Sequence, residues 1–271
     1  MRKKIYNTSP QMEFEVGMLV MKFGGVSAAT AKSFLKIADL ILERAKEHNQ
    51  IVVVVSAMGN TTDQLLNLAK EVHPEPPDRE LDMLVSVGER VSIALLAMAL
   101  SLKGKEAVSF TGSQSGIITS EHHTNAKIID VRPHRLLPIL NKGQIAIVAG
   151  FQGVSRKGEI TTLGRGGSDI SAVALAIALD APKVEFYKDV QGIFTADPKK
   201  DPTAKLLSFL NYSEALQITQ KGAKVLHSRC IELAEKNGVQ LSVLSFLHPK
   251  EGGTEIGSAK RGEEKLYEMA G

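Results

Sequence analysis

The 271-residue sequence has one cysteine, Cys230, no tryptophan and a formal net charge of only +3 at pH 7. A single cysteine excludes an internal disulfide and favours a reducing compartment, so we predict a cytoplasmic protein. We interpret Cys230 itself as a small buried hydrophobic residue. The small net charge gives no sign of a nucleic-acid partner, and no Lys/Arg run alternates with aromatic residues, so we predict none.

Long apolar runs are also missing. The longest, Val91 to Leu102, is interrupted by Ser92 and Ser101 and is shorter than the roughly 20 apolar residues that span a bilayer. Residues 1–16 begin with basic residues but continue with polar ones, unlike the apolar core of a signal peptide. We therefore predict a polar lead-in over residues 1–16 and no membrane contact.

Short apolar runs alternate along the chain with segments of helical periodicity. Ile51 to Val55 is five β-branched residues in a row, which is typical of a central parallel strand buried on both faces. The other predicted strands are 18–23, 107–110, 128–131, 145–149, 184–187 and 241–246, with a hairpin over 154–162. This alternation predicts an α/β fold in one continuous domain, with an open, mainly parallel sheet and helices on both faces.

The predicted helices differ in character. The helix from about Ala28 to Glu47 has one apolar face, and Ser27 is placed to cap it. A single helix from about Arg79 to Leu102 is nearly apolar all round, so we expect it to be central. Shorter helical patterns cover residues around 134–141 and the segment 212–236.

The stretch Thr161-Thr162-Leu163-Gly164-Arg165-Gly166-Gly167-Ser168-Asp169 is the strongest candidate for a binding loop. Its glycines allow positive φ and close approach of a ligand. Ser168 or Asp169 can cap the apolar helix 170–179 that follows, and a helix N-terminus suits an anion. Arg165 adds a bidentate fork for a carboxylate or phosphate. The alternative is an ordinary glycine-rich turn before a capped helix.

Polar clusters also stand at the predicted carboxyl ends of strands, where ligands bind in open α/β sheets. They are Lys22 with Gly24-Gly25, Ser56 to Thr62, Thr111 to Ser115, Arg165 to Asp169, and Lys188-Asp189. Glu89 is a separate case, because a carboxylate inside so apolar a helix is costly unless it is paired. It either pairs with Arg90, although adjacent helical residues do not face one another, or it binds a ligand or supports a residue that does; we favour the second interpretation.

The common phosphate-binding motifs are absent from the sequence. It contains no Gly-x-x-x-x-Gly-Lys-Ser/Thr loop, the glycines around Arg165 lack the dinucleotide spacing, and no His-Arg-Asp catalytic loop occurs. His122 and His123 have no further ligand at metal-binding spacing, so we interpret them as loop residues. A nucleotide would have to be bound in another way.

The sequence closely resembles aspartate kinases, of the amino acid kinase superfamily, from about residue 18 to 257. The motifs that carry the resemblance are Lys22-Phe23-Gly24-Gly25, Val55 to Asp63, Gly88-Glu89-Arg90, Phe110 to Gln114, Thr162 to Asp169, Lys188 to Lys199, and Gly222 to His227. The resemblance implies the amino acid kinase fold and transfer of the ATP γ-phosphoryl group, with Mg²⁺, to the β-carboxylate of L-aspartate. The product would be 4-phospho-L-aspartate, in the first step of the pathway to lysine, threonine and diaminopimelate.

The resemblance also implies roles for individual residues. Lys22, Asp169 and Lys224 would be catalytic, with Asp169 ordering the lysines. The substrate would be held by Ser56, Thr62, Glu89, Gln114, Arg165 and Ser168, with Arg165 and Ser168 on a carboxylate and Glu89 on the ammonium. The nucleotide would be held by Lys22, Phe23, Gly24, Gly25, Lys188, Asp189, Phe194, Lys199 and Lys224. No protein ligand for the metal is predicted, since Mg²⁺ would bridge phosphate oxygens.

Within a catalytic domain over residues 17–260, the resemblance implies an amino-acid-binding lobe at about 17–180 and a nucleotide-binding lobe at about 181–260. We predict that residues 261–271 form a polar tail. No ACT regulatory domain follows in this sequence, so we expect that lysine and threonine do not change the activity. Self-association would then use the kinase domain, with the helix 79–102 as a candidate surface. Val26, Lys188, Phe194, Lys199 and Ser228 depart from the commonest family pattern without removing a charge that the chemistry needs.

Two alternatives stay open. One is another superfamily kinase, acting on glutamate, acetylglutamate, carbamate or UMP. The motif Gly88-Glu89-Arg90 argues against this alternative, because a carboxylate that binds an ammonium group suits an amino acid with a free α-amine. The other is an inactive regulatory homologue that binds nucleotide or amino acid. Retention of Lys22, Glu89, Arg165, Asp169 and Lys224 argues against that reading.

Overall fold

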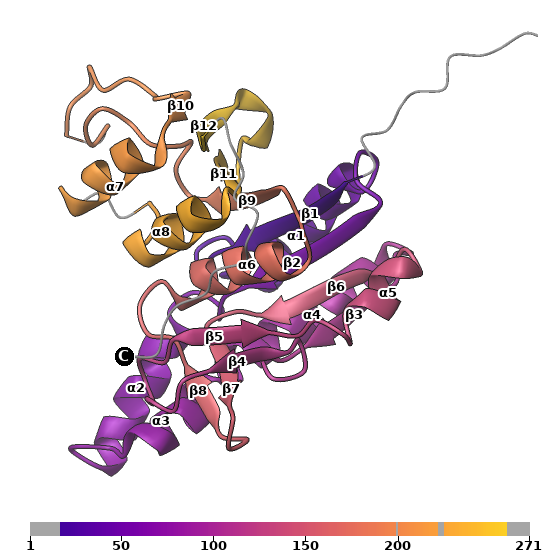
Figure 1. The fold of residues 1–271 in the computed structure, drawn as a ribbon, viewed down its shortest axis with the longest axis vertical. Helices are drawn as coiled ribbons and strands as arrows, with labels where there is room; N and C mark the ends of the chain where they lie inside the picture. Colours follow the sequence, from indigo (N-terminus) through magenta and orange to yellow (C-terminus); the bar gives the residue numbers. More distant parts are fainter. Residues whose placement is uncertain (1–16, 199, 222–224, 259–271) are drawn as a thin grey trace, which may run out of the picture.

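The computed structural model describes residues 17–198, 200–221 and 225–258, which form two sheets with helices packed around them (Figure 1). In chain order the elements are β1 (Met18–Phe23), α1 (Ala31–Arg44), β2 (Gln50–Val55), α2 (Thr61–Val72), α3 (Asp78–Val85), α4 (Val87–Leu102), β3 (Ala107–Phe110), β4 (Ile117–Thr119), β5 (Ile128–Val131), α5 (Leu137–Asn141), β6 (Ile145–Ala149), β7 (Gln152–Ser155), β8 (Ile160–Thr162), α6 (Gly167–Ala178), β9 (Lys183–Lys188), β10 (Phe209–Leu210), α7 (Tyr212–Gln220), α8 (Ser228–Asn237), β11 (Gln240–Ser245), a 3-10 turn (Pro249–Glu251) and β12 (Gly253–Ile256).

The larger sheet has eight strands in the order β10-β12-β11-β9-β1-β2-β6-β3. Every neighbouring pair in it is parallel except β11 and β12. The β-branched run Ile51–Val55 lies in β2, buried between β1 and β6, as its composition predicts. The predicted α/β class with a mainly parallel sheet is therefore confirmed. The division into lobes at about residue 180 stays a prediction, since β9–β12 continue the same sheet.

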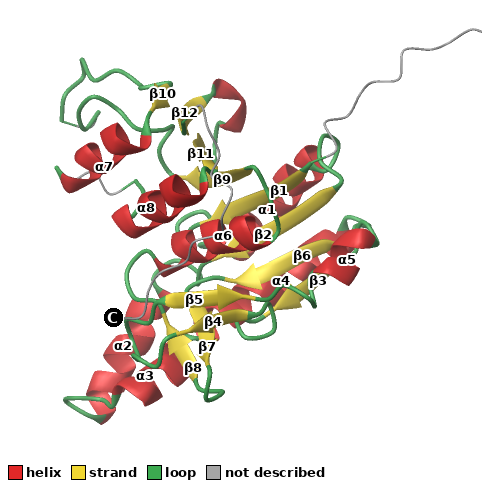
Figure 2. Cartoon of the chain, in the orientation of Figure 1, coloured by secondary structure: helices red, strands yellow, loops and turns green. Residues whose placement is uncertain are grey.

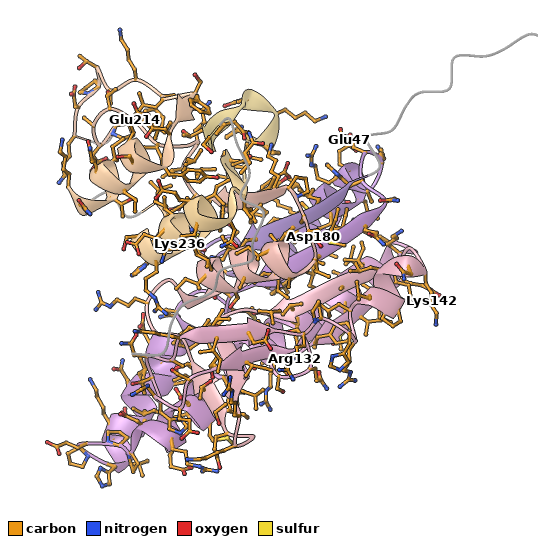
Figure 3. The ribbon with its side chains drawn as sticks, viewed as in Figure 1. Glu47, Arg132, Lys142, Asp180, Glu214 and Lys236 are labelled. Atoms are coloured by element: carbon orange, nitrogen blue, oxygen red, sulfur yellow. The ribbon has the colours of Figure 1, made fainter. Side chains whose placement is uncertain are left out.

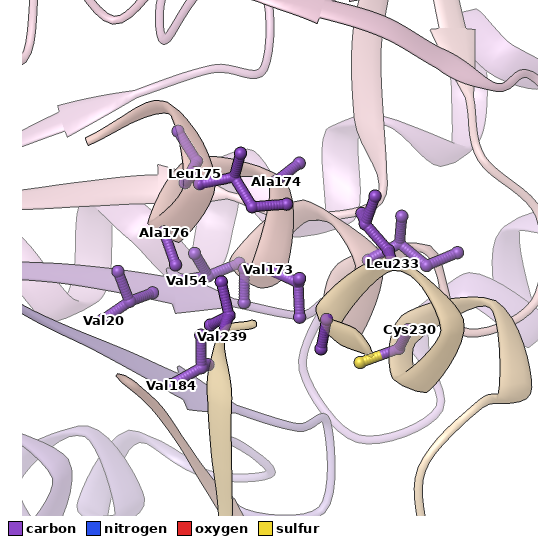
Figure 4. Close-up of a cluster of buried hydrophobic side chains, with 14 of the residues drawn as sticks. Val20, Val54, Val173, Ala174, Leu175, Ala176, Val184, Cys230, Leu233 and Val239 are labelled. Carbon is purple, nitrogen blue, oxygen red and sulfur yellow. The ribbon is translucent and has the colours of Figure 1, made fainter. Parts of the chain in front are cut away.

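Helices cover both faces of this sheet (Figure 2). Alternate side chains of β1 divide between them: Leu19, Met21 and Phe23 pack with α1 and α4, whereas Val20 packs with α6 and α8. Figure 4 shows the second of these cores, where Val173 of α6 and Leu233 of α8 meet above strands β1, β2 and β9. Cys230 is buried in that core, as its sequence context predicts.

A second, four-stranded sheet in the order β5-β4-β7-β8 lies beside α2 and α3. Its β7–β8 pair is the predicted hairpin, and β5 is a predicted strand. The sequence did not indicate β4, because three residues are too few to show periodicity. The packing is close at Gly112, where a Cβ atom would lie 1.9 Å from the carbonyl oxygen of Gln152.

The single helix predicted over residues 79–102 is wrong. It is two helices, α3 and α4, which meet at Ser86. The Ser86 carbonyl accepts a hydrogen bond from the Gln152 side chain at 2.8 Å, a contact between distant segments that periodicity cannot show. Nor is α4 buried all round, because Met98 is 65% and Leu102 78% exposed. By length and composition the segment Asp78–Leu102 could cross a membrane, and half of its most apolar window is buried inside the fold.

Two predicted helix caps are also wrong. Helix α1 begins at Ala31, and Thr30 caps it by accepting from the backbone N–H of Ser33, whereas the Ser27 hydroxyl donates to the carbonyl of Tyr187. Helix α6 begins at Gly167, with Gly166 at the N-cap and no side-chain cap. Ser168 and Asp169 therefore lie inside the first turn, and their side chains are available for other contacts.

Candidate active site

Charged side chains lie mostly on the outside of the fold, as Arg132, Lys142, Glu214 and Lys236 do in Figure 3. Within the described part of the chain the buried charged side chains are Lys22, Asp82, Glu89, Asp169 and Glu185. Glu185 has a structural partner, because Arg44 donates to both of its carboxylate oxygens. The other four line one cavity, and burial of charge at this density is typical of a functional site.

The cavity has a volume of about 660 Å³ and opens at the carboxyl ends of β1 and β2, between α2, α3 and the start of α6. The predicted site residues that line it are Lys22, Gly25, Ser56, Thr62, Glu89, Arg165, Ser168 and Asp169. They come from separate strands, helices and turns of the chain. Parallel register explains why Lys22 and Ser56 meet, because the carboxyl ends of β1 and β2 lie at one edge of the large sheet, whereas Arg165 follows β8 of the smaller sheet.

Two ammonium groups and one carboxylate form a cluster at the cavity, where Lys22 and Asp169 are buried in the lining and the partly exposed Lys188 contacts Asp169. Lys22 Nζ is 2.6 Å from Asp169 Oδ1, and Lys188 Nζ is 2.9 Å from Asp169 Oδ2. Burial alone would raise the pKa of Asp169, but the charges of Lys188 and Lys22 outweigh it and lower that pKa to about 2. Burial lowers the pKa of Lys22, which the Asp169 charge partly offsets. The cluster carries a net positive charge when both lysines are protonated, which suits an anionic ligand.

The turn after β1 needs glycine at position 25, whereas position 24 has room for a Cβ atom. A Cβ on Gly25 would lie 2.8 Å from the carbonyl oxygen of Gly59 and 2.9 Å from that of Ala57. A Cβ on Gly24 would lie 3.6 Å from Lys22 Nζ. Glycine at both positions therefore leaves the backbone open beside the lysine, as expected of a loop that approaches phosphate closely.

The glycine-rich turn before α6 adopts the predicted backbone. Gly164 and Gly166 have φ values of +71° and +74°, and a Cβ on Gly167 would lie 2.8 Å from the Leu163 side chain. Arg165, between them, is exposed at the cavity wall and forms no hydrogen bond or ion pair with any described residue. The turn therefore presents a guanidinium group to the cavity.

Glu89, on the first turn of α4, is a buried carboxylate with one oxygen unsatisfied. Its Oε1 accepts from the backbone N–H of Ala57 at 3.1 Å, while Oε2 is buried without a partner among the described residues. Burial raises the pKa of Glu89 to about 7, against the smaller lowering effects of backbone hydrogen bonds and Lys22. The predicted alternative, a pair with Arg90, does not form, so Glu89 is placed to accept from a cationic ligand.

A family model described as the amino acid kinase family matches residues 17–245. The chain belongs to this family. It is 53% identical to an aspartokinase of Mycolicibacterium smegmatis over 88% of this chain and 56% of that protein. It also resembles the crystal structure of aspartate kinase from Synechocystis, with a TM-score of 0.81 and 43% identity, covering 91% of this chain and 40% of that one.

E. coli aspartokinase III in complex with aspartate and ADP is a further structural relative of this amino acid kinase. Its TM-score is 0.81 at 28% identity, covering 90% of this chain and 65% of that one. The chain spans little more than half the length of the curated relatives it matches.

Other predicted site residues lie outside the cavity lining. Gln114 is exposed, and its side chain accepts from the backbone N–H of Thr111. Phe23 is in the core, with its ring 4.8 Å from that of Tyr187. Asp189 and Phe194 are not among the lining residues. Lys199 and Lys224 fall outside the residues that the structure describes.

Asp82 and Phe151, which were not among the predicted site residues, also line the cavity. Asp82 precedes Glu89 by seven residues, about two helical turns, within the same apolar pattern. A carboxylate in so apolar a segment needs a partner, and this holds for Asp82 as it does for Glu89. No signal in the sequence singled out Phe151.

The raised pKa of Glu89 predicts how the free energy of unfolding depends on pH. Glu89 titrates near 4.5 in the unfolded chain and about 7 in the fold. The fold therefore favours its protonated form, and stability is lost as pH rises from about 4.5 through 7. Wild type should lose up to about 3 kcal/mol relative to Glu89→Gln between pH 4.5 and 8.5, measured by urea unfolding. The exposed Glu71→Gln is the control, and parallel stability profiles for wild type and Glu89→Gln would contradict the assignment.

Proposed function

We propose that the chain catalyses ATP-dependent phosphorylation of the β-carboxylate of L-aspartate, which gives 4-phospho-L-aspartate and ADP. The observation that carries the proposal is the unsatisfied carboxylate oxygen of Glu89, in the same cavity as the unpaired guanidinium of Arg165. Together they complement the ammonium and α-carboxylate of an amino acid. The aspartokinase names of relatives about 50% identical support aspartate as that amino acid.

One group of cavity residues would bind the amino acid. Arg165 and Ser168 would bind its α-carboxylate, and Glu89 its ammonium. Ser56, in the turn after β2, and Thr62, in α2, also line the cavity and would orient the side chain of the substrate. Because the Glu89 carboxylate already sits in a low-dielectric site, an ammonium placed there gains more than it would in water.

A second group of residues would position the phosphoryl group. Lys22 and Lys188, held by Asp169, would neutralise charge that spreads onto the phosphoryl oxygens, and Gly24 and Gly25 leave room for close approach. Phosphoryl transfer depends mostly on positioning and electrostatics, so no protein nucleophile is required. The other proposed nucleotide contacts are Asp189 and Phe194, together with Lys199 and Lys224, which are not among the described residues.

Mg²⁺ fits this site as an ion carried by the nucleotide. No group of three or more His, Cys, Asp or Glu side chains among the described residues could hold a metal. Mg²⁺ keeps several waters and binds substrate phosphates with few protein carboxylates, so a protein cage is not needed. When bound, Mg²⁺ would supply further neutralisation of phosphate charge beside Lys22.

Of the competing acceptors, glutamate also carries a free α-ammonium and is separated from aspartate by the assay below, whereas the others fit the cavity less well. Acetylglutamate, carbamate and UMP lack a free α-ammonium and would leave Glu89 Oε2 unsatisfied. An inactive homologue would have no reason to keep the Lys22–Asp169–Lys188 cluster buried. We further propose a cytoplasmic role in the biosynthesis of lysine, threonine and diaminopimelate. Self-association through the kinase domain, with the exposed face of α4 as its surface, also stays a proposal.

The test is the rate of ADP release with L-aspartate, L-glutamate, N-acetylaspartate, N-acetylglutamate, carbamate and UMP. Aspartate should have the highest kcat/KM. N-acetylaspartate should be at least roughly 10-fold worse, because a buried group left unpaired costs about 1–3 kcal/mol. Faster turnover of N-acetylglutamate, carbamate or UMP would assign a different substrate and give Glu89 another role.

Lys22→Ala should reduce kcat by roughly 10²–10³ while leaving the Kd for aspartate nearly unchanged, because the Lys22 charge serves the phosphoryl group. Stopped assays and calorimetric titration with aspartate measure the two quantities. Lys183→Ala, in the same sheet but at the amino end of β9 where it pairs with Glu255, is the matched control and should keep the wild-type kcat. Wild-type turnover by Lys22→Ala would refute the role.

A further inference from the structure

Asp82 is fully buried on α3, and all of its contacts are with the protein. Oδ1 accepts from the Thr162 hydroxyl at 2.5 Å, and Oδ2 accepts from the ring nitrogen Nδ1 of His123 at 2.8 Å. The backbone N–H of Thr124 donates to both oxygens at 3.1 Å. With both oxygens engaged, Asp82 has little capacity left for a substrate, although it lines the cavity.

These contacts join three segments that are distant in the sequence. Asp82 belongs to α3, His123 and Thr124 to the loop between β4 and β5, and Thr162 is the last residue of β8. Thr124 has a φ of +63°, which is unfavourable for a β-branched residue. Strain of this kind persists only where the surrounding contacts impose it, and it clusters at binding sites.

The segments that Asp82 joins lead to the two ends of the proposed amino-acid site. Thr162 is followed, three residues later, by Arg165. In the other direction α3 meets α4 at Ser86, and Glu89 lies in the first turn of α4. The hydrogen bond from Gln152 to the Ser86 carbonyl ties that joint to β7, the partner strand of β8. The Asp82–Thr162 contact therefore links the segment that carries Arg165, at the end of β8, to the segment that carries Glu89, at the junction of α3 and α4.

We propose that Asp82 is a positioning residue for amino-acid binding, which fixes the separation of Arg165 and Glu89 by tying α3 to the end of β8. The inference rests on the proposed function, in which those two side chains bind the carboxylate and ammonium of one substrate. A buried carboxylate is costly, and a small displacement of a binding group weakens a ligand that must contact both groups at once.

Thr161 and Thr162 offer a matched pair of substitutions. Both are buried on β8, but their side chains point to opposite faces, and the Thr161 hydroxyl lies 2.5 Å from that of Thr119 instead of Asp82. Thr161→Val and Thr162→Val each remove one buried hydroxyl without changing the shape of the side chain. They should lower the melting temperature by similar amounts, so loss of stability alone cannot separate them.

The experiment measures KM for the amino acid, KM for ATP and kcat in Asp82→Asn, Thr162→Val, the double variant and Thr161→Val. Asp82→Asn and Thr162→Val should each raise the amino-acid KM roughly 10- to 100-fold, with kcat and the KM for ATP within about 3-fold. The double variant should be little worse than either single one, because both break the same contact. Thr161→Val should keep all three wild-type values, and Thr162→Ser should restore the amino-acid KM.

Three outcomes would overturn the inference: unchanged amino-acid KM in both single variants, an equal rise in Thr161→Val, or additive effects in the double variant, which would mean that Thr162 contacts the substrate by itself. The comparison uses whichever acceptor the wild type phosphorylates fastest. An error in the proposed function would therefore appear as a different acceptor for the wild type, while the comparison among variants would still test Asp82.

Discussion

The carboxylate of Asp169, held between two ammonium groups, is the interaction on which the site depends. Lys22 comes from β1, Lys188 from β9 and Asp169 from α6, so one buried ion cluster requires two strands and a helix to meet at the same edge of the sheet. Without Asp169, two lysines would face one another in a region of low dielectric, where like charges repel strongly. The carboxylate makes a net positive site stable enough to exist inside the fold.

Two parts of the cavity have opposite electrostatic character. In the Lys22–Asp169–Lys188 cluster positive charge is only partly balanced, which favours an anion. At Glu89 one carboxylate oxygen is buried without a partner among the described residues, and the pKa of about 7 expresses the cost of ionising it there. A ligand that carries an ammonium at one end and receives a phosphoryl group at the other would relieve both. The charge distribution of the cavity is therefore consistent with the proposed substrate.

Much of this could be predicted from sequence because it follows from local pattern and parallel register. The buried run in β2 and the turns after β1 and β8 were recognisable, and parallel register of β1 and β2 brought Lys22 and Ser56 to one cavity. What could not be predicted depended on contacts between distant segments. The junction of α3 and α4 at Ser86 accepts a hydrogen bond from the distant Gln152, and the proposed role of Asp82 depends on its hydrogen bond with Thr162. Gln114 stood in a suggestive motif, but its side chain satisfies its own turn.

In the proposed function, a phosphoryl group is transferred to the side-chain carboxylate of aspartate. Hydroxylamine traps an acyl phosphate as a hydroxamate, so the decisive measurement is product analysis after incubation of the full chain with ATP, Mg²⁺, L-aspartate and hydroxylamine. The expected product is the β-hydroxamate of aspartate, formed in step with ADP and absent without aspartate. ADP release without any hydroxamate, or a hydroxamate on the α-carboxyl group, would contradict it.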